Sequence, residues 1–544
     1  MGVYLNSKSA YTLFKSEREK PYFVDKTQML AELFPLVKTG NNHICITRPR
    51  RFGKTVAANM ISSFFSEAFD ARDIFASLKI AENQEWESYR NKFPVIHISL
   101  HELGGDCRSY KDYIDRIEKR LVRDLKRAYP KLETEDLDSA ADVLLELYLE
   151  EDVRFLFVLD EWDFIFHQSF TREQDKKDYL LFLRNLLKDR PYVLLAYMTG
   201  ILPIAKYSSG SELNMFSEYT MASEERFSEY FGFTDGEVDH LFARYQKQGH
   251  HKEQVTREGL RKWYDGYHTK SGERLYNPRS VVMALSNNNL GNYWSSSGPY
   301  DEIFYYIQKN VDAVRDALAL MVSQNAVPVK IYEYAATAQE LSTKEQILSA
   351  MVVYGFLSYE NGRVFIPNKE LMDQFADMLK REASLGYVYR LAKASERMLQ
   401  ATLGGDTKTM EKILEQTHDM ETPILSHNHE TELSAVVNLV YLSARDYYRV
   451  EREEKAGKGY VDFIFYPEVP PASDGIILEL KVDHTPEEAI AQIRKKDYSQ
   501  RFWRRSGKKT AGRILLVGIG YDRKSKEHHC KVEVMQLYDG RKRD

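Results

Sequence analysis

The chain has 544 residues, longer than one ordinary hydrophobic core supports, so we expect about two to four domains. Hydrophobic residues make up 43% and charged residues 29%, a composition that excludes an intrinsically disordered chain. The net charge of −5 gives no support to nucleic-acid binding, so any surface of that kind must be a local patch.

The cysteines and the apolar runs indicate a cytoplasmic protein. Cys45, Cys107 and Cys530 are far apart and odd in number, which favours a reducing compartment over a disulfide framework. No signal peptide is expected at the start, and the longest apolar stretch, YVLLAYMTGILPIA, is too short and too interrupted to span a bilayer. His528 and His529 stand directly beside Cys530 and lack zinc-ligand spacing, so we predict no zinc site there.

The first motif is a phosphate-binding loop with an unusual entrance. Gly53, Lys54 and Thr55 match the second half of G-x-x-x-x-G-K-[ST], but Arg48 replaces the first glycine. The apolar run NHICIT precedes the loop, and TVAANMISSFFSEAF follows it with the spacing of a helix. Strand, loop and helix in this order direct helix N-terminal amides at a phosphate. We predict that Lys54 meets the β- and γ-phosphates of ATP and that the Thr55 hydroxyl holds Mg²⁺. The alternative is a basic turn before a helix.

The entrance of this loop is stiffer and more basic than usual. The first glycine of a usual loop lets the backbone turn closely around the phosphates, and Pro49 with its fixed φ indicates another route. Arg48, Arg50 and Arg51 cannot all point at the phosphates, so we expect at least one of them to brace neighbouring acidic groups. The predicted ATP-binding loop comprises Arg48, Pro49, Arg50, Arg51, Phe52, Gly53, Lys54 and Thr55.

A second motif supports the ATP site. In RFLFVLDEWD, five apolar residues (155–159) precede Asp160 and Glu161, as expected for a buried parallel strand whose carboxyl end carries ligands. Asp160 would hold the Mg²⁺ through water, and Glu161 would polarise the attacking water. Thr199, near the end of YVLLAYMTG, stands where a polar sensor of the γ-phosphate is expected.

The surrounding pattern predicts the fold of this region. FPVIHISL supplies a further strand, and helical patterns such as YIDRIEKRLVRDLKRAY lie between the strands. Strands that alternate with helices predict an α/β fold, here the parallel sheet of a P-loop NTPase with both faces covered. The alternative is an α/β domain that binds no nucleotide.

Several motifs together carry a resemblance to a known family. They are, in chain order, YFVDKTQML, ITRPRRFGKT, FVLDEWD, YFGFTDGEV, WYDGYH, YNPRSV and NYWSSSG. The chain resembles the bacterial AAA-ATPase-like proteins, P-loop proteins usually fused to a C-terminal nuclease-like domain of the PD-(D/E)XK superfamily. In that family the loop resembles R-P-R-R-F-G-K-[ST], so Arg48 is the family's form. Phe23, Asp25 and Lys26 match an N-terminal segment that resembles the adenine-side lid of related ATPases.

The middle of the chain changes character. Helical periodicity dominates from about Thr234 to Met420, and KEQILSAMVVYGFLSYENGRVFIPNKELMDQF predicts a helix, a hairpin turning at Asn361-Gly362, and a second helix. This winged-helix-like order is compatible with DNA contact or with packing beside the ATPase, and the scarcity of arginines favours packing. An aromatic cluster has the same two interpretations, core packing or base stacking, and we favour packing. Its members are Trp263, Tyr264, Tyr267, Tyr276 and Trp294.

The last part of the chain carries a pattern of metal-dependent nucleases. In GYVDFIFYP and GIILELKV, alternation places Asp462 on one strand and Glu479 with Lys481 on one face of another, the D…E-x-K order. Two carboxylates on neighbouring strands supply oxygen ligands for Mg²⁺, with Mn²⁺ as an alternative, and the lysine would orient the attacking water. A preceding helix offers Glu432 as a further acid. A following helix carries Gln492 and Tyr498 at the Q-x5-Y spacing seen in the superfamily. Relatives commonly show G-R-x-D, and Tyr460 stands in place of that arginine.

These patterns predict three regions and leave two functions open. The regions are a P-loop AAA-ATPase-like domain (1–233), a helical and winged-helix-like region (234–420), and an α/β restriction-endonuclease-like domain (421–544). One function is an ATP hydrolase that gates a nuclease acting on DNA or RNA. The other is a nucleotide-dependent switch whose nuclease-like domain does not cut. The sequence leaves open whether the protein is a homo-oligomer whose subunits share an ATP site.

Overall fold

The computed structural model describes most of the chain. The described residues are 2–105, 107–132, 139–204, 212–221, 224–249, 254–294, 299–331, 341–415, 430–456, 459–468, 473–496, 502 and 513–536. The chain divides into two compact units, of which the first holds residues 1–298, 329–341 and 345–370. The second unit holds residues 299–328, 342–344 and 371–544. The three predicted regions stay a prediction, since this division is one of contacts and not of function.

The first unit is built on a five-stranded parallel sheet, as predicted for a P-loop NTPase. Its strands, in the order β2-β3-β4-β1-β5 across the sheet, are β1 (Asn42–Thr47), β2 (Val95–Ser99), β3 (Phe155–Asp160), β4 (Val193–Gly200) and β5 (Ser217–Thr220). Every residue of β3 is buried, which is the pattern of a strand covered on both faces. Thr199 pairs in register with Ile46 of β1 and with Asp160 of β3. The carboxyl ends of β1, β4 and β3 therefore meet at one edge of the sheet.

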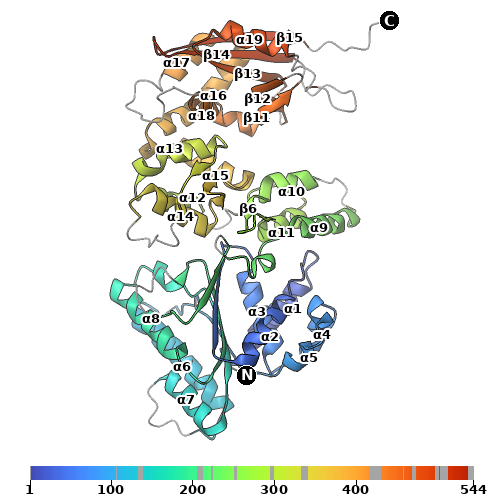
Figure 1. Cartoon of the computed structure of the whole chain (residues 1–544), viewed down its shortest axis with the longest axis vertical. Helices are drawn as coiled ribbons and strands as arrows, with labels where there is room; N and C mark the ends of the chain where they lie inside the picture. The colour runs from blue at the N-terminus through green and yellow to red at the C-terminus, as the bar shows by residue number, and fades with distance from the viewer. Residues whose placement is uncertain are drawn as a thin grey trace. The chain divides into compact units, whose positions relative to one another are not determined.

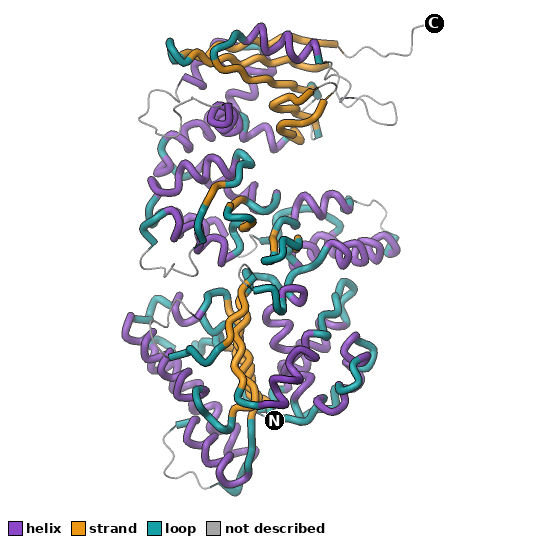
Figure 2. The backbone as a smooth tube through the Cα atoms, in the orientation of Figure 1, coloured by secondary structure: helices purple, strands orange, loops and turns teal. Residues whose placement is uncertain are grey.

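Helices cover both faces of this sheet, as Figures 1 and 2 show. One side carries α1 (Lys8–Arg18), α2 (Met29–Thr39), α3 (Lys54–Phe65), α4 (Arg72–Phe75) and α5 (Trp86–Tyr89), and the other carries α6 (Tyr110–Ala128), α7 (Ala140–Glu151) and α8 (Glu173–Leu187). A buried cluster that includes Phe14, Leu33, Ile61 and Phe64 packs the first set against Val158 and Tyr197 of the sheet. Burial of this apolar area fixes α3, the helix that follows the loop after β1, against the sheet.

The rest of the first unit is a smaller helical layer with short strands. It contains α9 (Asp235–Lys247), α10 (Arg257–Tyr264), β6 (Tyr267–His268), β7 (Arg274–Leu275), α11 (Pro278–Asn287), β9 (Ser358–Glu360), β10 (Arg363–Phe365) and all but the first residue of α14 (Lys344–Tyr354). Tyr264, Tyr267, Tyr276 and Trp294 are buried here, and Trp263 is partly buried against the Lys369 ammonium. The packing interpretation of the aromatic cluster is confirmed for these side chains.

The predicted helix–hairpin–helix order in the middle of the chain is confirmed. The hairpin β9–β10 turns at Asn361 and Gly362, whose φ values of 49° and 80° are those of a tight turn that needs two left-handed residues. The second helix, α15 (Lys369–Arg381), begins in the first unit and continues in the second. The winged-helix arrangement of these elements stays a prediction.

The second unit is built on a mixed sheet. Its strands follow one another in sequence order: β11 (Tyr448–Ala456), β12 (Gly459–Pro467), β13 (Gly475–Val482), β14 (Arg513–Asp522) and β15 (Glu527–Gln536). Only β13 and β14 are parallel among the described strands of this sheet. Helices of the unit are α12 (Pro299–Ile307), α13 (Val311–Val322), α16 (Tyr387–Gly404), α17 (Thr407–Glu415), α18 (Glu430–Val440) and α19 (Pro486–Lys495), beside the short strand β8 (Val327–Pro328). Isoleucines of α19 pack on Ile477 and Leu516 in a buried cluster, so α19 is fixed beside β13.

Within the described ranges, each helix is either too short or too polar to cross a lipid bilayer.

Candidate functional site

The loop after β1 turns without the usual first glycine. Gly53 caps α3 in the left-handed conformation with a φ of 89°, and a non-glycine residue, Arg51, adopts a φ of 70° two positions earlier. A left-handed non-glycine residue costs about 1–3 kcal/mol and persists only where neighbouring contacts impose it. The first turn of α3 contains no acidic residue, so its N-terminal amides are available to an anion.

The Lys54 side chain bonds back onto its own loop, and its predicted contact with the phosphates stays a prediction. Its ammonium donates hydrogen bonds of 2.9 Å to the carbonyls of Arg48 and Pro49. Burial lowers the pKa of Lys54 to about 8, and the nearby carboxylates of Asp163 and Asp160 oppose that shift. A phosphate group would supply the negative charge that favours the ammonium form. The residue types present therefore fit a nucleotide phosphate.

Arg48 is part of the structural frame of the site. It is 1% exposed, and its Nη1 donates to the carbonyls of Thr47 and Tyr219, both at 2.8 Å. Its guanidinium also lies 5.1 Å from the ring centroid of Phe231. Arg48 thus ties the end of β1 to the edge strand β5.

We expect Arg48→Gly to weaken the ATP site. The change removes a buried hydrogen bond, a partly buried one and a cation–π contact, and it leaves the Tyr219 carbonyl without this donor, so the end of β1 keeps its backbone pairing with β5 but loses the side-chain contacts that reinforce it. Each lost hydrogen bond to a charged donor costs about 1.5–3 kcal/mol, and ATP affinity measured with a fluorescent nucleotide should fall at least tenfold. Improved affinity would show that the arginine is only tolerated there.

The other loop arginines have different surroundings. Arg50 is exposed. Arg51 donates to the carbonyl of Tyr293, lies over the ring of Trp294, and lowers the pKa of the buried Glu370 carboxyl, which burial itself raises. The charge of Arg51 thus acts on a buried carboxyl, which is compatible with the expected bracing of an acidic group, and that role stays a prediction.

Asp160 and Thr55 meet beside the loop. Asp160 is fully buried at the end of β3, and its Oδ1 accepts a 3.0 Å hydrogen bond from the Glu161 amide. Burial raises the pKa of Asp160 to about 6, and hydrogen bonding by the Thr55 side chain opposes the rise. A hydroxyl and a buried carboxylate side by side form a donor set that suits Mg²⁺.

Glu161 and His101 form a pair at the same edge. Glu161 has a φ of 55°, which turns the chain at the end of β3, and its Oε2 lies 3.6 Å from Nδ1 of His101. Strained backbone of this kind gathers at functional sites. Sequence reasoning missed His101, although it follows β2 by two residues and the rule that ligands sit at carboxyl ends of strands could have found it.

Thr199 lies between the two motifs but is already bonded. It is fully buried, and its hydroxyl donates a 2.9 Å hydrogen bond to the carbonyl of Ile46. This bond joins β4 to β1 and uses the hydroxyl hydrogen that a γ-phosphate sensor would offer. The role of Thr199 as a γ-phosphate sensor stays a prediction, and the hydrogen bond to Ile46 gives the hydroxyl an alternative, structural role.

Asp25 and Lys26, the two polar residues that match the lid-like N-terminal segment, both bond to other parts of the first unit. Asp25 accepts hydrogen bonds from Thr27 and from the Lys79 amide. Lys26 forms an ion pair with Glu237 and donates to the Glu229 carbonyl. These contacts hold the segment against residues before α5 and in α9.

The second site lies where β12 and β13 run side by side. Phe463 pairs with Leu478, so Asp462 and Glu479 come next in the antiparallel register. Oδ2 of Asp462 accepts a 2.7 Å hydrogen bond from the Leu480 amide. Glu479 is 2% exposed, and burial together with the Asp462 charge raises its pKa to about 7. Two like charges held this close suit a divalent cation.

Lys481 and Gln492 complete this cluster. Lys481 lies 3.2 Å from Oε1 of Glu479, and Gln492 of α19 donates to the same oxygen. Oε2 of Glu479 is buried and accepts no hydrogen bond from any described residue. An unpartnered buried carboxylate oxygen beside a second carboxylate fits a metal ligand. Glu432, Tyr460 and Tyr498 lie outside the described side chains.

Over the described residues, no set of three or more His, Cys, Asp or Glu side chains is gathered as a metal cluster. The nuclease-like site therefore offers two carboxylates, and the ATP site one carboxylate with a hydroxyl.

The raised pKa of Glu479 predicts how the metal-free protein responds to pH. Its folded pKa of about 7 lies above the ordinary value of 4.5, so the folded state binds more protons than the unfolded state between these values. Stability should therefore fall as pH rises from 4.5 to about 7, by on the order of 3 kcal/mol. Glu479→Gln should melt near wild type at pH 5 and above wild type at pH 8. Equal melting temperatures at pH 8, measured by calorimetry with a chelator, would contradict this.

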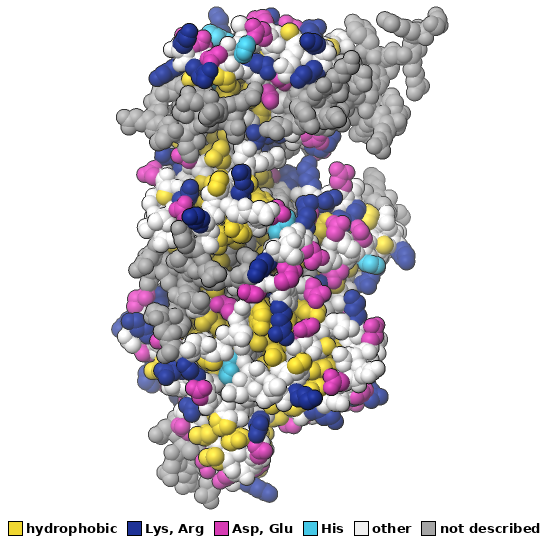
Figure 3. Space-filling view, viewed as in Figure 1, with side chains coloured by type: hydrophobic (Ala, Val, Ile, Leu, Met, Phe, Trp, Pro, Cys, Tyr) yellow, Lys and Arg dark blue, Asp and Glu magenta, His cyan; other side chains and the backbone are white. Residues whose placement is uncertain are grey.

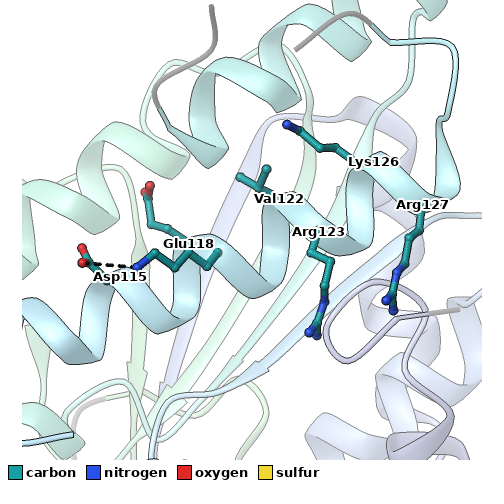
Figure 4. A pocket seen from close by; sticks show the side chains of 7 residues that line it. Asp115, Glu118, Val122, Arg123, Lys126 and Arg127 are labelled. Carbon is teal, nitrogen blue, oxygen red and sulfur yellow. Dashed lines mark ion pairs between the residues drawn. The ribbon is translucent and has the colours of Figure 1, made fainter. Parts of the chain in front are cut away.

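A hollow of about 570 Å³ lies along α6 and is lined by residues that belong to neither site. Figure 4 shows Asp115 and Glu118 at one end and Arg123, Lys126 and Arg127 at the other. On the face in view in Figure 3, charges of both signs are likewise interspersed. The mixed lining matches no single charged ligand, and we assign none to it.

Comparison with known proteins finds the two expected domains. Residues 12–209 match the family described as "Predicted AAA-ATPase", and residues 430–528 match the PD-(D/E)XK nuclease superfamily. The chain therefore carries an AAA-ATPase-like domain and a C-terminal domain of that nuclease superfamily. The resemblance inferred from the motifs is confirmed in this form.

Individual relatives are more distant. An uncharacterized protein in the vnfD 5′ region of Azotobacter chroococcum mcd 1 is 26% identical over 287 residues, and the match spans 52% of each chain, about half of that relative's length. A Walker-type ATPase of Pyrococcus abyssi is 12% identical with a TM-score of 0.39, covering 65% of this chain and 96% of that one. The Aeropyrum pernix ORC2 protein is 10% identical with a TM-score of 0.32, covering 65% and 92%. These structural similarities are slight, and the fold described above rests on the chain's own sheet order.

Proposed function

We propose that this chain, an AAA-ATPase-like domain joined to a PD-(D/E)XK nuclease-superfamily domain, hydrolyses ATP and uses a metal-dependent nuclease site on DNA or RNA. The observation that carries the nuclease part is the pair formed by Asp462 and the buried Glu479, with one glutamate oxygen left without a described hydrogen-bond donor. The ATPase part is supported by Lys54, Thr55 and Asp160 at one sheet edge.

In the ATP site each residue has a separate role. Lys54 and the N-terminal amides of α3 bind the phosphates, while Thr55 and Asp160 would hold Mg²⁺. When bound, Mg²⁺ neutralises charge on the phosphate oxygens. Glu161 orients a water molecule and accepts its proton, and His101 keeps the glutamate carboxylate in place. The remaining loop residues fix the shape of the cradle.

In the nuclease-like site the two carboxylates would hold the metal ion and the neighbouring polar side chains have positioning roles. Asp462 and Glu479 would hold Mg²⁺ or Mn²⁺, which supplies Lewis-acid chemistry when bound. Lys481 donates a hydrogen bond to Oε1 of Glu479 and would orient the water that attacks a phosphodiester. Gln492, on α19, donates to the same glutamate oxygen and would keep it in place. The local geometry supports hydrolysis of a phosphodiester bond in nucleic acid.

The alternative is a nucleotide-dependent switch whose nuclease-like domain does not cut. Purified full-length protein should be incubated with DNA and RNA, with Mg²⁺ or Mn²⁺, and with or without ATP. Cleavage that requires the metal supports the proposal. ATP hydrolysis with no cleavage under any of these conditions favours the switch. Native mass spectrometry with and without ATP tests whether the protein acts as a homo-oligomer.

A further inference from the structure

Residues far along the chain, which follow the strands of the parallel sheet in sequence, contact the phosphate-binding loop. Pro49, Arg51 and Phe52 each contact a side chain or backbone group between residues 267 and 370, all within the first unit. None of these contacts involves a group that we place on the nucleotide. The shape of the loop is therefore set by two different parts of the sequence.

The first support is a buried carboxylate behind Arg51. Glu370 is 1% exposed and accepts hydrogen bonds from the amides of Tyr293 (2.5 Å) and Trp294 (2.7 Å). It also accepts from the Ser280 hydroxyl at 2.8 Å. Glu370 thus fixes the turn at residues 293–294, and this turn presents the carbonyl and the indole ring that Arg51 contacts.

The second support is a close approach of backbone to Pro49. Gly355 has a φ of 83°, and a Cβ added there would lie 2.6 Å from the Cβ of Pro49. The Tyr267 hydroxyl donates a 3.0 Å hydrogen bond to the Gly355 carbonyl, and the Tyr267 ring packs edge-on against Phe52 at 5.0 Å. Gly355 and Tyr267 therefore press on two of the loop residues next to the strained Arg51.

We propose that Glu370, Gly355 and Arg51 are positioning residues of the ATP site. Arg51 keeps its left-handed backbone because the turn at residues 293–294, which Glu370 fixes, holds its guanidinium. Gly355 is required because only a residue without a Cβ lets Pro49 pack directly against the backbone at position 355. The loop keeps a phosphate-binding shape without its first glycine because residues 267–370 impose that shape. This inference rests on the proposed ATP site.

A matched pair of glycine substitutions tests it. Gly355 and Gly362 have φ values of 83° and 80°, so alanine adds the same backbone strain at both, but a Cβ at Gly362 meets nothing within 4 Å. Gly355→Ala should displace the loop and lower kcat for ATP hydrolysis on the order of 100-fold, as expected for about a 1 Å misplacement. Gly362→Ala should stay within about twofold of wild type. Equal ATP hydrolysis by the two variants would overturn the inference.

A second pair decides the question if Gly355→Ala fails to fold. Arg51→Ala should weaken ATP binding roughly tenfold or more, equal to about 1.4 kcal/mol, and Arg51→Lys should recover part of it because a lysine retains the charge and can donate to the Tyr293 carbonyl but cannot stack on Trp294 as the guanidinium does. Without nucleotide, Arg51→Ala should melt slightly below wild type because it loses the hydrogen bond to the Tyr293 carbonyl, and its ATP-induced rise in melting temperature should be smaller than that of wild type at the same ATP concentration. Wild-type affinity in Arg51→Ala would contradict the proposal. If wild type itself binds no ATP, the proposed function fails instead, and Lys54→Ala serves as its separate control.

Discussion

Glu161→Gln is expected to bind ATP and to hydrolyse it roughly 10²–10⁴-fold more slowly than wild type. Glutamine has the same shape as glutamate but cannot accept a proton from water, and it removes the charge that faces His101. The loop, Lys54 and Asp160 are unchanged by this substitution, so nucleotide affinity should remain. Steady-state phosphate release and equilibrium titration with a fluorescent ATP analogue measure the two quantities separately.

Two further variants serve as controls for Glu161→Gln. Lys54→Ala should abolish nucleotide binding, because it removes the ammonium that spans the loop. Glu150→Gln makes the same charge change on the exposed surface of α7 and should hydrolyse ATP at the wild-type rate. If Glu161→Gln also hydrolyses at the wild-type rate, the role assigned to Glu161 is wrong.

The strands that carry the motifs could be predicted because their signals are local. NHICIT and GIILELKV coincide with β1 and β13 in the structure, and the apolar run before Asp160 is β3. A buried strand needs continuous or alternating apolar residues, and both patterns are legible in a single sequence. The Asn361-Gly362 turn was predictable for the same reason, since few residue pairs tolerate two left-handed conformations.

The partners of the loop arginines could not be predicted. Arg48 bonds to a carbonyl of β5, a four-residue strand with little apolar signal, and Arg51 reaches a carbonyl 242 residues away. Contacts to backbone carbonyls leave no trace in residue type, because every residue offers the same acceptor. Only the expectation that one arginine would brace an acidic group followed from charge, and the charge of Arg51, which opposes the burial-raised pKa of Glu370, is compatible with it.

The nuclease-like cluster was predictable in its acids and not in its surroundings. Period-two alternation placed Asp462, Glu479 and Lys481 on neighbouring strands, and in the structure Lys481 contacts a Glu479 oxygen while the Asp462 charge acts on the Glu479 carboxyl. The near-complete burial of Glu479 depends on α19 packing across β13 and β14, strands whose pairing joins residues about 40 apart. Burial is what raises the Glu479 pKa, so the electrostatics of the site required the tertiary structure.

Asp462→Ala is expected to abolish metal-dependent cleavage and to leave ATP hydrolysis intact. The change removes one of two carboxylates that would hold the cation, whereas Lys54, Thr55 and Asp160 belong to the first unit and are untouched. Because alanine also leaves the Leu480 amide without its acceptor, Asp462→Asn should be made in parallel, since its amide oxygen can keep that bond. Both variants should lose cleavage of DNA or RNA with Mg²⁺ or Mn²⁺.

Lys481→Ala separates binding of the metal from the cleavage step. The lysine contacts an oxygen of Glu479 and is not itself a ligand, so the variant should bind Mn²⁺ with near wild-type affinity and still lose cleavage. Lys531→Ala removes a partly exposed lysine of β15 in the same unit, which pairs with Glu487 and Glu533, and should cut normally. Metal affinity by calorimetry and product formation on gels give the two readouts.

If metal-loaded wild type cuts nothing, or Asp462→Ala and Asp462→Asn cut as well as wild type, the nuclease assignment fails. The chain would then act as the nucleotide-dependent switch, with Asp462 and Glu479 binding a cation, or packing, without hydrolysis.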